Sequence, residues 1–338
     1  MPNLHEALDL ARAIRRAHLE LSRELVRTCR EQSPYLLGSV ERDLPGDTIF
    51  RLDAIAEPML LQLFSQVAEI APLVLVAEGL EGGQVVLPTD TDPSRVRWRV
   101  IVDPIDGTRG LVYQKRSAWI LTAIAVNKGP ETRLRDVVAA VQTEVPTIKQ
   151  HLLDQLMWVE ERGVEAWRLS LSGDDKMAIH PRPSTADTIL HGYAMLSRFF
   201  PGARDVIAAI EERLIRELLG DSPSGKALCF EDQYASTGGQ FYELAMGHDR
   251  FNGDIRPLLA EELRRRGQPL GLCCHPYDVC TAPIAQALGV IITDPTGQPL
   301  DCALDLEANV AWIGYANHQI RDKVQPILTR LLKEFGLL

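Results

Sequence analysis

The sequence lacks the marks of a membrane, secreted or nucleic-acid-binding protein. No apolar run reaches 18 residues, and the first 26 residues, MPNLHEALDLARAIRRAHLELSRELV, contain no apolar signal-peptide block. We therefore predict neither a membrane span nor a membrane partner. Cysteine is scarce, and six scattered residues in 338 favour a reduced, cytoplasmic protein over a disulfide scaffold. The formal net charge is −10, and such a surface does not bind a nucleic acid polymer through its overall charge.

Apolar spacing predicts two helices and then a series of strands in the first 180 residues. Apolar residues recur at helical spacing from Leu4 to Leu25, and those from Ile55 to Ile70 predict a second helix with Pro58 in or near its first turn. Short apolar runs bounded by turn residues predict buried strands over 73–78, 97–104, 118–129 and 136–146, and a hairpin over 156–170 that turns at residues 162 and 163.

From about residue 180 the pattern changes. The stretch HPRPSTAD (180–187) is typical of a linker, and helix-patterned and strand-like segments then alternate up to a closing helix that ends near Phe335. Such alternation favours an α/β layer. We therefore predict an α/β protein with an α+β N-terminal domain (residues 1–180) and an α/β C-terminal domain (residues 181–338).

One strand ends in an unusual charge pattern. In RWRVIVDPIDGTRG (97–110) an apolar run is followed by Asp103 and Asp106, and then by Gly107-Thr108. Like charges that close resist joint ionisation unless a cation lies between them. Carboxylate oxygens of this kind favour Mg²⁺, and two such ions about 3.5–4 Å apart could activate a water for an in-line displacement. The N–H groups of the Gly107-Thr108 turn could bind a phosphate beside them.

Two further carboxylates lie at similar positions. Glu78 ends the apolar run LVLVAE, and Asp278 lies in HPYDVCTAPIAQAL, just before a helical pattern. Each has a simpler explanation, since an Asp before a helix is usually a cap and a Glu at a strand end is usually solvated.

Together these segments resemble the three signatures of the inositol monophosphatase superfamily. The resemblance rests on DPIDGT (103–108), AE (77–78) and YDVCTAP (277–283), in an order and spacing that agree over nearly the whole chain. STGGQFYELAMG (236–247) is similar to the small-residue segment that precedes the last motif. That superfamily contains lithium-sensitive, Mg²⁺-dependent phosphomonoesterases with fructose-bisphosphatase and nucleotide-phosphatase relatives. The resemblance implies a layered α-β-α-β-α sandwich and a homodimer.

The resemblance also implies which residues hold the metal ions. Glu78, Asp103 and the Ile105 carbonyl would bind one Mg²⁺. Asp103, Asp106 and Asp278 would bind a second, and Glu78 could reach a third ion through water. The expected cofactor is thus Mg²⁺, as two or three ions.

The phosphate and the attacking water would be held by the next residues along the chain. By resemblance, the backbone N–H groups of Gly107 and Thr108 would bind the phosphate. The Thr108 hydroxyl, paired with Asp53, would orient the attacking water and help to deprotonate it. Hydrolysis of a small phosphorylated metabolite (a sugar, polyol or nucleotide phosphate) would then proceed without a phosphoenzyme.

Several positions depart from the superfamily pattern. Gly79 stands where a second acid often follows the Glu, and Tyr277 replaces the usual Trp. The acid that contacts inositol hydroxyls would fall near Gly271, so inositol phosphate is a poor candidate substrate. The extra length lies around residues 146–225, where the substrate pocket would be built. The metal ligands are present, whereas substrate recognition is changed.

A few other side chains are candidates for substrate binding. Arg109 directly follows Thr108 and could bind a second anionic group, or could pair with a surface acid instead. Further candidates are Arg198, Lys226, Arg256 and His275. A zinc site at Cys273, Cys274, His275 and Cys280 is disfavoured because the spacing contains no C-x₂-C pair.

Two other function classes use similar residues or the same fold. A haloacid-dehalogenase-type phosphatase also uses a pair of aspartates, but at D-x-D spacing, whereas this chain has D-x-x-D. A non-catalytic phosphometabolite-binding or regulatory protein on the same fold stays open, because a motif alone does not establish turnover.

Overall fold

The structure is a computed structural model that describes residues 3–44, 47–172, 175–220 and 225–338. The α-helices are α1 (Leu4–Glu31), α2 (Pro34–Leu37), α3 (Arg51–Val67), α4 (Thr108–Val112), α5 (Arg204–Leu219), α6 (Thr237–Ala245), α7 (Ala260–Arg265), α8 (Pro276–Val279), α9 (Ala282–Ala287) and α10 (His318–Glu334). The strands are β1 (Val40–Leu44), β2 (Asp47–Phe50), β3 (Leu73–Ala77), β4 (Gln84–Leu87), β5 (Trp98–Asp106), β6 (Ala118–Val126), β7 (Val137–Val145), β8 (Leu152–Val159), β9 (Gly163–Ser170), β10 (Lys176–Ala178), β11 (Tyr193–Leu196), β12 (Asp249–Asp254), β13 (Ile291–Thr293) and β14 (Trp312–Tyr315).

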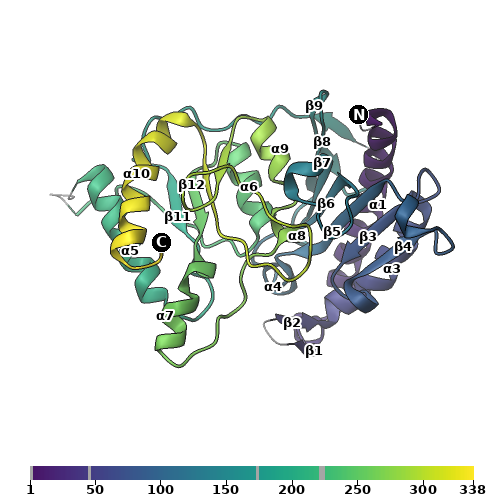
Figure 1. Cartoon of the computed structure of the whole chain (residues 1–338), viewed down its shortest axis with the longest axis horizontal. Helices are drawn as coiled ribbons and strands as arrows, with labels where there is room; N and C mark the ends of the chain where they lie inside the picture. Colours follow the sequence, from purple (N-terminus) through teal and green to yellow (C-terminus); the bar gives the residue numbers. More distant parts are fainter. Residues whose placement is uncertain (1–2, 45–46, 173–174, 221–224) are drawn as a thin grey trace.

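These elements stack in five layers (Figure 1). Helices α1 and α3 cover one face of an eight-stranded sheet of order β10-β9-β8-β7-β6-β5-β3-β4. Helices α6, α8 and α9 contact its other face, and α6 also contacts a four-stranded sheet of order β11-β12-β14-β13. Helices α5 and α10 cover the far side of that second sheet. The predicted α-β-α-β-α sandwich is therefore confirmed.

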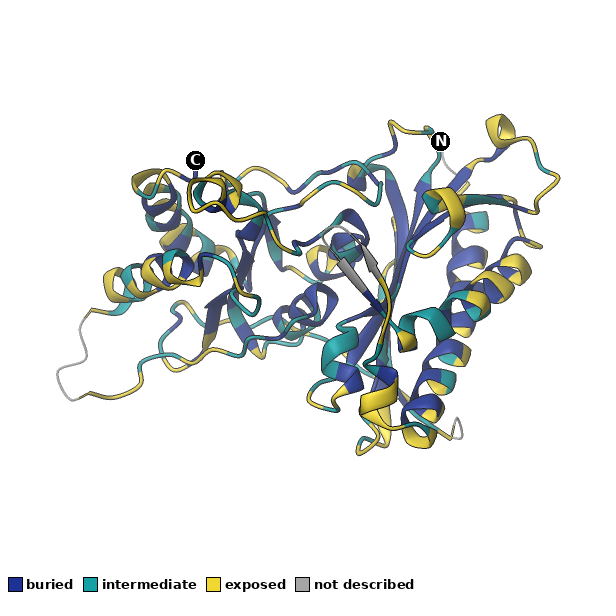
Figure 2. Cartoon of the chain, turned by 90° about the horizontal axis from the view of Figure 1, so that it is seen from below, coloured by how far each residue is buried: buried dark blue, intermediate teal, exposed yellow. Residues whose placement is uncertain are grey.

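Alternation along the strands explains why each sheet is covered on both faces. In β3, Leu73 and Leu75 lie in the core against α1 and α3, whereas Val74 and Val76 lie in the core against the middle helices. Successive strand residues point to opposite faces, so an unbroken apolar run needs cover on both. In Figure 2 the strands are mostly buried, and the exposed residues are concentrated on outer helix faces and loops.

Most of the elements predicted from the sequence are present, with two corrections in α3. Pro58 lies inside the helix rather than in its first turn. Proline removes the hydrogen bond to the carbonyl four residues earlier, here that of Ala54, and because Pro58 is exposed water can reach that side of the helix. Ile70 lies beyond the helix end at Val67 and is 41% exposed, so it is not part of the apolar face.

The two-domain division at residue 180 stays a prediction. Strand β10, the last of the large sheet, ends at Ala178, and β11 of the second sheet begins at Tyr193. The middle helices come from the C-terminal half yet pack against the large sheet. Within the described residues no helix is long and apolar enough to cross a membrane.

A buried histidine joins α1 to the large sheet. His18 is 1% exposed, and its ring nitrogens lie 3.1 Å from Thr143 Oγ1 and 2.8 Å from Thr122 Oγ1. Burial lowers the pKa of His18 to about 3, because a charged imidazole would lose its hydration there. His18 is therefore neutral in the folded protein at neutral pH.

We expect this histidine to make the fold sensitive to acid. Its folded pKa lies below its unfolded value of about 6.5. The contribution of His18 to the free energy of unfolding is thus fully present above about pH 6.5. It is lost as the pH falls, because the unfolded chain then binds a proton that the folded chain does not bind. Between pH 6 and pH 5 the loss is about 1 kcal/mol. Urea unfolding of the wild type and of His18→Gln at several pH values measures this loss. If the free energy of unfolding falls as steeply between pH 6 and pH 5 in the variant as in the wild type, the prediction is wrong.

Candidate metal centre

A bulge at the end of β5 brings its two aspartates to one side of the sheet. Residues three apart on a regular strand point to opposite faces. In the pairing with β6, Asp103 lies opposite Leu121 and Asp106 opposite Trp119, so three residue steps on β5 match two on β6. The extra residue of such a bulge changes the side to which the following side chains point. Asp103 and Asp106 therefore face the same site.

Asp278 joins this pair from the middle layer. It lies at the third position of α8, where its Oδ2 accepts a hydrogen bond of 2.6 Å from the His275 N–H. The sequence suggested a cap on the helix that follows Asp278, but Asp278 lies inside α8 and forms a capping box with the residue before that helix. One carboxylate oxygen from each of Asp103, Asp106 and Asp278 lies within 4.8 Å of the others. The cap also places a third negative charge beside the strand end.

Burial and mutual repulsion make this triad costly to ionise without a cation. Burial raises the pKa of Asp103 well above its usual range, and the charges of Asp106, Asp278 and Glu78 add to the effect. Burial raises the pKa of Asp106 to about 7, against the hydrogen bonds that it accepts. Burial and the charge of Asp106 likewise raise the pKa of Asp278.

The triad fits Mg²⁺ in donor type and spacing. All its donors are oxygens, and oxygens that share one octahedral ion at about 2.1 Å lie roughly 3–4 Å apart, a spacing compatible with the limit of 4.8 Å in the triad. A bound cation would also offset the repulsion that raises these pKa values.

The beginning of α6 fixes Asp106. Its Oδ2 accepts hydrogen bonds from the Ser236 hydroxyl at 2.8 Å and the Gly238 N–H at 2.7 Å. A Cβ at Gly238 would lie 2.4 Å from a Leu121 side-chain carbon, so only glycine allows the helix to approach so closely. Both contacts use the same oxygen, so they fix the Asp106 carboxylate against the start of α6.

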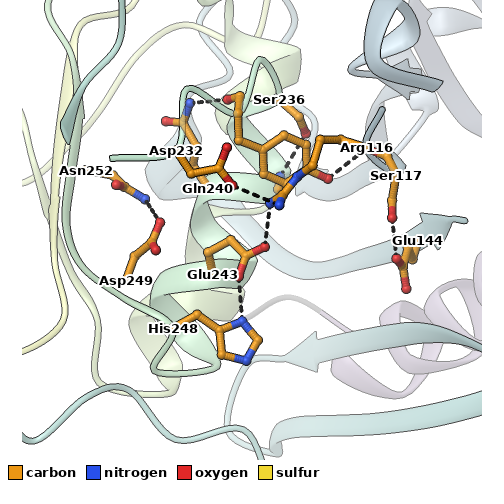
Figure 3. Close-up of polar contacts among 12 residues, drawn as sticks. Arg116, Ser117, Glu144, Asp232, Ser236, Gln240, Glu243, His248, Asp249 and Asn252 are labelled. Carbon is orange, nitrogen blue, oxygen red and sulfur yellow. Dashed lines mark hydrogen bonds and ion pairs between the residues drawn. The ribbon is translucent and has the colours of Figure 1, made fainter. Parts of the chain in front are cut away.

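A charged network in turn supports α6 (Figure 3). Arg116 pairs with Asp232 before the helix at 2.8 Å and with Glu243 near its end at 2.9 Å. Its guanidinium also lies 4.2 Å from the ring centre of Tyr234. Arg116 thus contacts the chain on both sides of Ser236.

Glu78 lies near the triad and is held from α8. The Tyr277 hydroxyl donates a 2.6 Å hydrogen bond to Glu78 Oε1, so the tyrosine that replaces the expected tryptophan orients a predicted metal ligand. Glu78 contributes to the raised pKa values of Asp103 and Asp278. It is not among the three carboxylates that converge most closely.

Asp53 and Thr108 are brought together as predicted, although they are 55 residues apart. The Thr108 hydroxyl lies 2.8 Å from Asp53 Oδ1 and 2.8 Å from the Ile105 carbonyl oxygen. The other oxygen of Asp53 accepts the Phe50 N–H at 2.9 Å and caps α3. Gly107, the residue directly before α4, has φ of +95° and lies in the left-handed region, which glycine adopts readily.

The candidate site residues line one cleft. It is lined by Asp53, Glu57, Glu78, Asp103, Ile105, Asp106, Gly107, Thr108, Arg109, Arg256 and Asp278, together with apolar and aromatic residues. The metal, phosphate and water residues expected from the sequence therefore share one site. Their individual roles stay predictions.

Of the substrate candidates, Arg109 and Arg256 line the cleft, whereas three others do not. Arg198 pairs with Glu211 at 3.1 Å and with Glu231. Lys226 is exposed away from the cleft lining. The His275 ring lies 3.1 Å from the Ala308 carbonyl oxygen and stacks on Tyr277.

Glu57 is a cleft residue that the sequence analysis missed. A Cβ at Gly79 would lie 2.3 Å from Glu57 Oε1, so the glutamate side chain occupies the space beside Gly79. Glu57 also pairs with Arg42. A carboxylate from α3 thus lies beside the position where a second acid was expected. The signal was available, because Glu57 follows Asp53 by four residues and shares its helix face.

The cysteines give no second metal site among the described residues. Cys273 and Cys274 line the cleft, and Cys280 is buried nearby, but the one group of possible ligands that converges there is the aspartate triad. Burial raises the pKa values of all three thiols. These thiols are therefore buried and stay protonated at neutral pH.

Comparisons with known proteins agree on the fold. No protein-family model and no curated protein sequence matches the chain. The extragenic suppressor protein SuhB from Bartonella henselae has a similar structure, with a TM-score of 0.64, 17% identity and coverage of 94% of this chain and 98% of that one. The Leishmania major fructose-1,6-bisphosphatase matches with a TM-score of 0.68, 13% identity and coverage of 97% and 95%. The Thermotoga maritima IMPase matches with a TM-score of 0.56, 15% identity and coverage of 94% and 97%.

The resemblance to the inositol monophosphatase superfamily is thus confirmed at the level of the fold, over nearly the whole chain.

Proposed function

We propose that this chain is a Mg²⁺-dependent phosphatase that hydrolyses a phosphomonoester of a small metabolite. The observation that carries the proposal is the joint presence, in one cleft, of the aspartate triad and the Asp53–Thr108 pair. A capping or purely structural role explains each acid alone, but not the convergence of three acids beside a paired hydroxyl and carboxylate. The fold shared with a fructose-1,6-bisphosphatase and an IMPase supports the same proposal.

Asp103, Asp106, Asp278, Glu78 and the Ile105 carbonyl would hold Mg²⁺, as two or three ions. When bound, Mg²⁺ supplies the positive charge that activates a water and neutralises the leaving oxygen.

The chain's own residues would position the reactants and carry the proton. The N–H groups of Gly107 and Thr108 bind the phosphate at the start of α4. The Thr108 hydroxyl has one proton and two oxygens within 2.8 Å, and it donates to the Asp53 carboxylate, the stronger acceptor. Thr108 Oγ then accepts a proton from the attacking water, while its own proton moves to Asp53. The oxygen of this water attacks phosphorus as the phosphorus–oxygen bond to the leaving group breaks, so no phosphoenzyme forms, and the leaving alkoxide takes a proton from solvent.

The proposal extends to location and assembly. All six cysteines lie in the described part of the chain, and none forms a disulfide, which supports the cytoplasm as the location. A homodimer stays a prediction that sedimentation can test.

The test is phosphate release from a panel of sugar, inositol, polyol and nucleotide phosphates, with Mg²⁺ and with a chelator. We expect Mg²⁺-dependent release from one class of compound, abolition by the chelator and inhibition by millimolar Li⁺. Release that is unaffected by the chelator would contradict the metal assignment. If no compound releases phosphate but calorimetry shows that Mg²⁺ binds, a non-catalytic binding protein is favoured instead.

A further inference from the structure

Aromatic rings and guanidinium groups form the part of the cleft wall that the proposed metal and phosphate residues do not use. We name it the aromatic–arginine wall; it consists of Phe50, Arg109, Phe199, Phe200 and Arg256, all of which line the cleft. Phe50 and Arg109 come from the N-terminal half of the chain and the other three from the C-terminal half. The wall therefore joins the two halves across the cleft.

The contacts within the wall form a continuous series. The guanidinium carbon of Arg109 lies 4.9 Å from the ring centre of Phe50 and 5.3 Å from that of Phe200. The guanidinium carbon of Arg256 lies 5.1 Å from the Phe200 ring and 4.5 Å from the Phe199 ring. The rings of Phe199 and Phe200 pack edge to face, with their centres 4.9 Å apart. Phe200 thus contacts both guanidinium groups.

Arg256 has a structural role in this wall. It is 8% exposed, its Nε donates to Asp254 Oδ1 at 2.9 Å, and its Nη1 donates to the Leu272 carbonyl at 2.8 Å. The buried Asp254 matches its charge. Arg256 therefore fixes Phe199 and Phe200 rather than binding a ligand itself.

Arg109 is placed to bind a ligand. It directly follows Thr108, and its guanidinium is flanked by two rings that restrict its rotamers. An arginine ordered in this way loses less entropy when it binds an anion. Contact with rings engages the faces of a guanidinium, whereas its hydrogen bonds to carboxylate or phosphate run in its plane. The rings and an anion can therefore be bound at the same time.

The charge distribution of the cleft distinguishes Arg109 from the acids around it. The carboxylates of Asp103, Asp106 and Asp278 converge at one place, whereas the Arg109 guanidinium lies against the rings of Phe50 and Phe200. The described cationic residues that line the cleft are Arg109 and Arg256, and the remaining charged ones are acids. A second anion on a substrate would be repelled along most of the cleft and attracted at Arg109.

We propose that the substrate is a phosphomonoester whose leaving group carries a second anionic group, a phosphate or a carboxylate, which Arg109 binds. The inference rests on the proposed phosphatase function, and it makes a neutral polyol phosphate a poor substrate. Because the second anion is bound before and during reaction alike, Arg109 contributes uniform binding, which affects KM more than kcat.

The test compares matched substrates that differ in the second anion. Fructose 1,6-bisphosphate is compared with fructose 1-phosphate, adenosine 3′,5′-bisphosphate with adenosine 3′-monophosphate, and 3-phosphoglycerate with glycerol 3-phosphate. The pairs separate phosphate from carboxylate as the second anion. The variants are Arg109→Gln and Arg109→Lys. Arg213→Gln is the matched control, because Arg213 contacts a phenyl ring, that of Phe335, and an acid, Glu334, outside the cleft lining.

In the wild type and in Arg213→Gln we expect kcat/KM to favour the doubly anionic member of at least one pair by about 10-fold or more. Arg109→Gln should reduce that ratio to about 2-fold, chiefly through KM, with Arg109→Lys between them. An equal loss for both members of each pair would indicate a structural role and overturn the inference. If the wild type hydrolyses both members of every pair equally well, the inference is overturned as well, but the proposed phosphatase function is not. No Mg²⁺-dependent hydrolysis of any compound would overturn both.

Discussion

Replacing Asp103 with asparagine is expected to reduce turnover by about 1,000-fold or more while leaving the chain folded. Asp103 is the one side chain expected in both proposed Mg²⁺ sets, and a neutral amide is a far weaker ligand for Mg²⁺ than a carboxylate. Loss of several kcal/mol of charge stabilisation in the transition state corresponds to a rate loss of this size. Phosphate release under saturating Mg²⁺, with circular dichroism to verify the fold, measures both parts.

The same substitution should stabilise the metal-free protein. Asparagine at 103 can still accept the 2.9 Å hydrogen bond from the Ile105 N–H, but it removes one of the buried charges that repel each other around Asp103. We expect the thermal midpoint in chelator to rise by about 2–4 °C, and Mg²⁺ to stabilise the variant less than the wild type.

Asp249→Asn is the matched control for Asp103→Asn. Asp249 is also buried, and burial raises its pKa to about 6, yet it lies in β12 outside the cleft lining. Its neutralisation should leave turnover intact. Activity of Asp103→Asn near that of the wild type would exclude the proposed metal set, whereas equal losses in both variants would show that buried charge in general, rather than the triad, limits activity.

Much of the fold could be predicted from the sequence because strand and helix periods are strong signals. The run LVLVAE predicted a buried strand, and β3 is covered on both faces by the cores that its alternation requires. Pro58 shows the limit of such rules. A proline inside α3 breaks a local preference, but its exposed position lets water reach the carbonyl that loses its hydrogen bond, and exposure is a tertiary property.

The candidate site could likewise be predicted only in part from the sequence. Asp103 and Asp106 are close in sequence, so their pairing was visible, but the bulge that turns them to one side depends on the register with β6. Thr108 and Asp53 were paired by resemblance rather than by any local pattern.

The aromatic–arginine wall had almost no sequence signal. Phe199 and Phe200 follow β11 in a segment with neither strand nor helix, and Arg256 lies on a different segment of the C-terminal half. Their meeting is a consequence of how the second sheet packs, which periodicity does not encode.

The second large effect is expected at the Asp53–Thr108 pair. Thr108→Val keeps the branched shape but removes the hydroxyl that lies 2.8 Å from Asp53, and Asp53→Asn keeps the shape but removes the proton acceptor. Each variant should lower kcat by about 100-fold or more, the usual contribution of a positioned acid–base group. Mg²⁺ affinity measured by calorimetry should change little in Thr108→Val, because the carboxylates of the triad are untouched.

The double variant decides whether the two side chains act as one unit. If the proton of the water passes through Thr108 to Asp53, either substitution breaks the relay, and the double variant should be no slower than the slower single one. Thr108→Ser, which keeps the hydroxyl, should retain most of the activity. Asp53 also caps α3 through the Phe50 N–H, and loss of that cap costs about 1 kcal/mol of stability; thermal unfolding of each variant separates this effect from the kinetic one. Multiplied rate losses in the double variant would show that the two groups contribute independently and would contradict the relay.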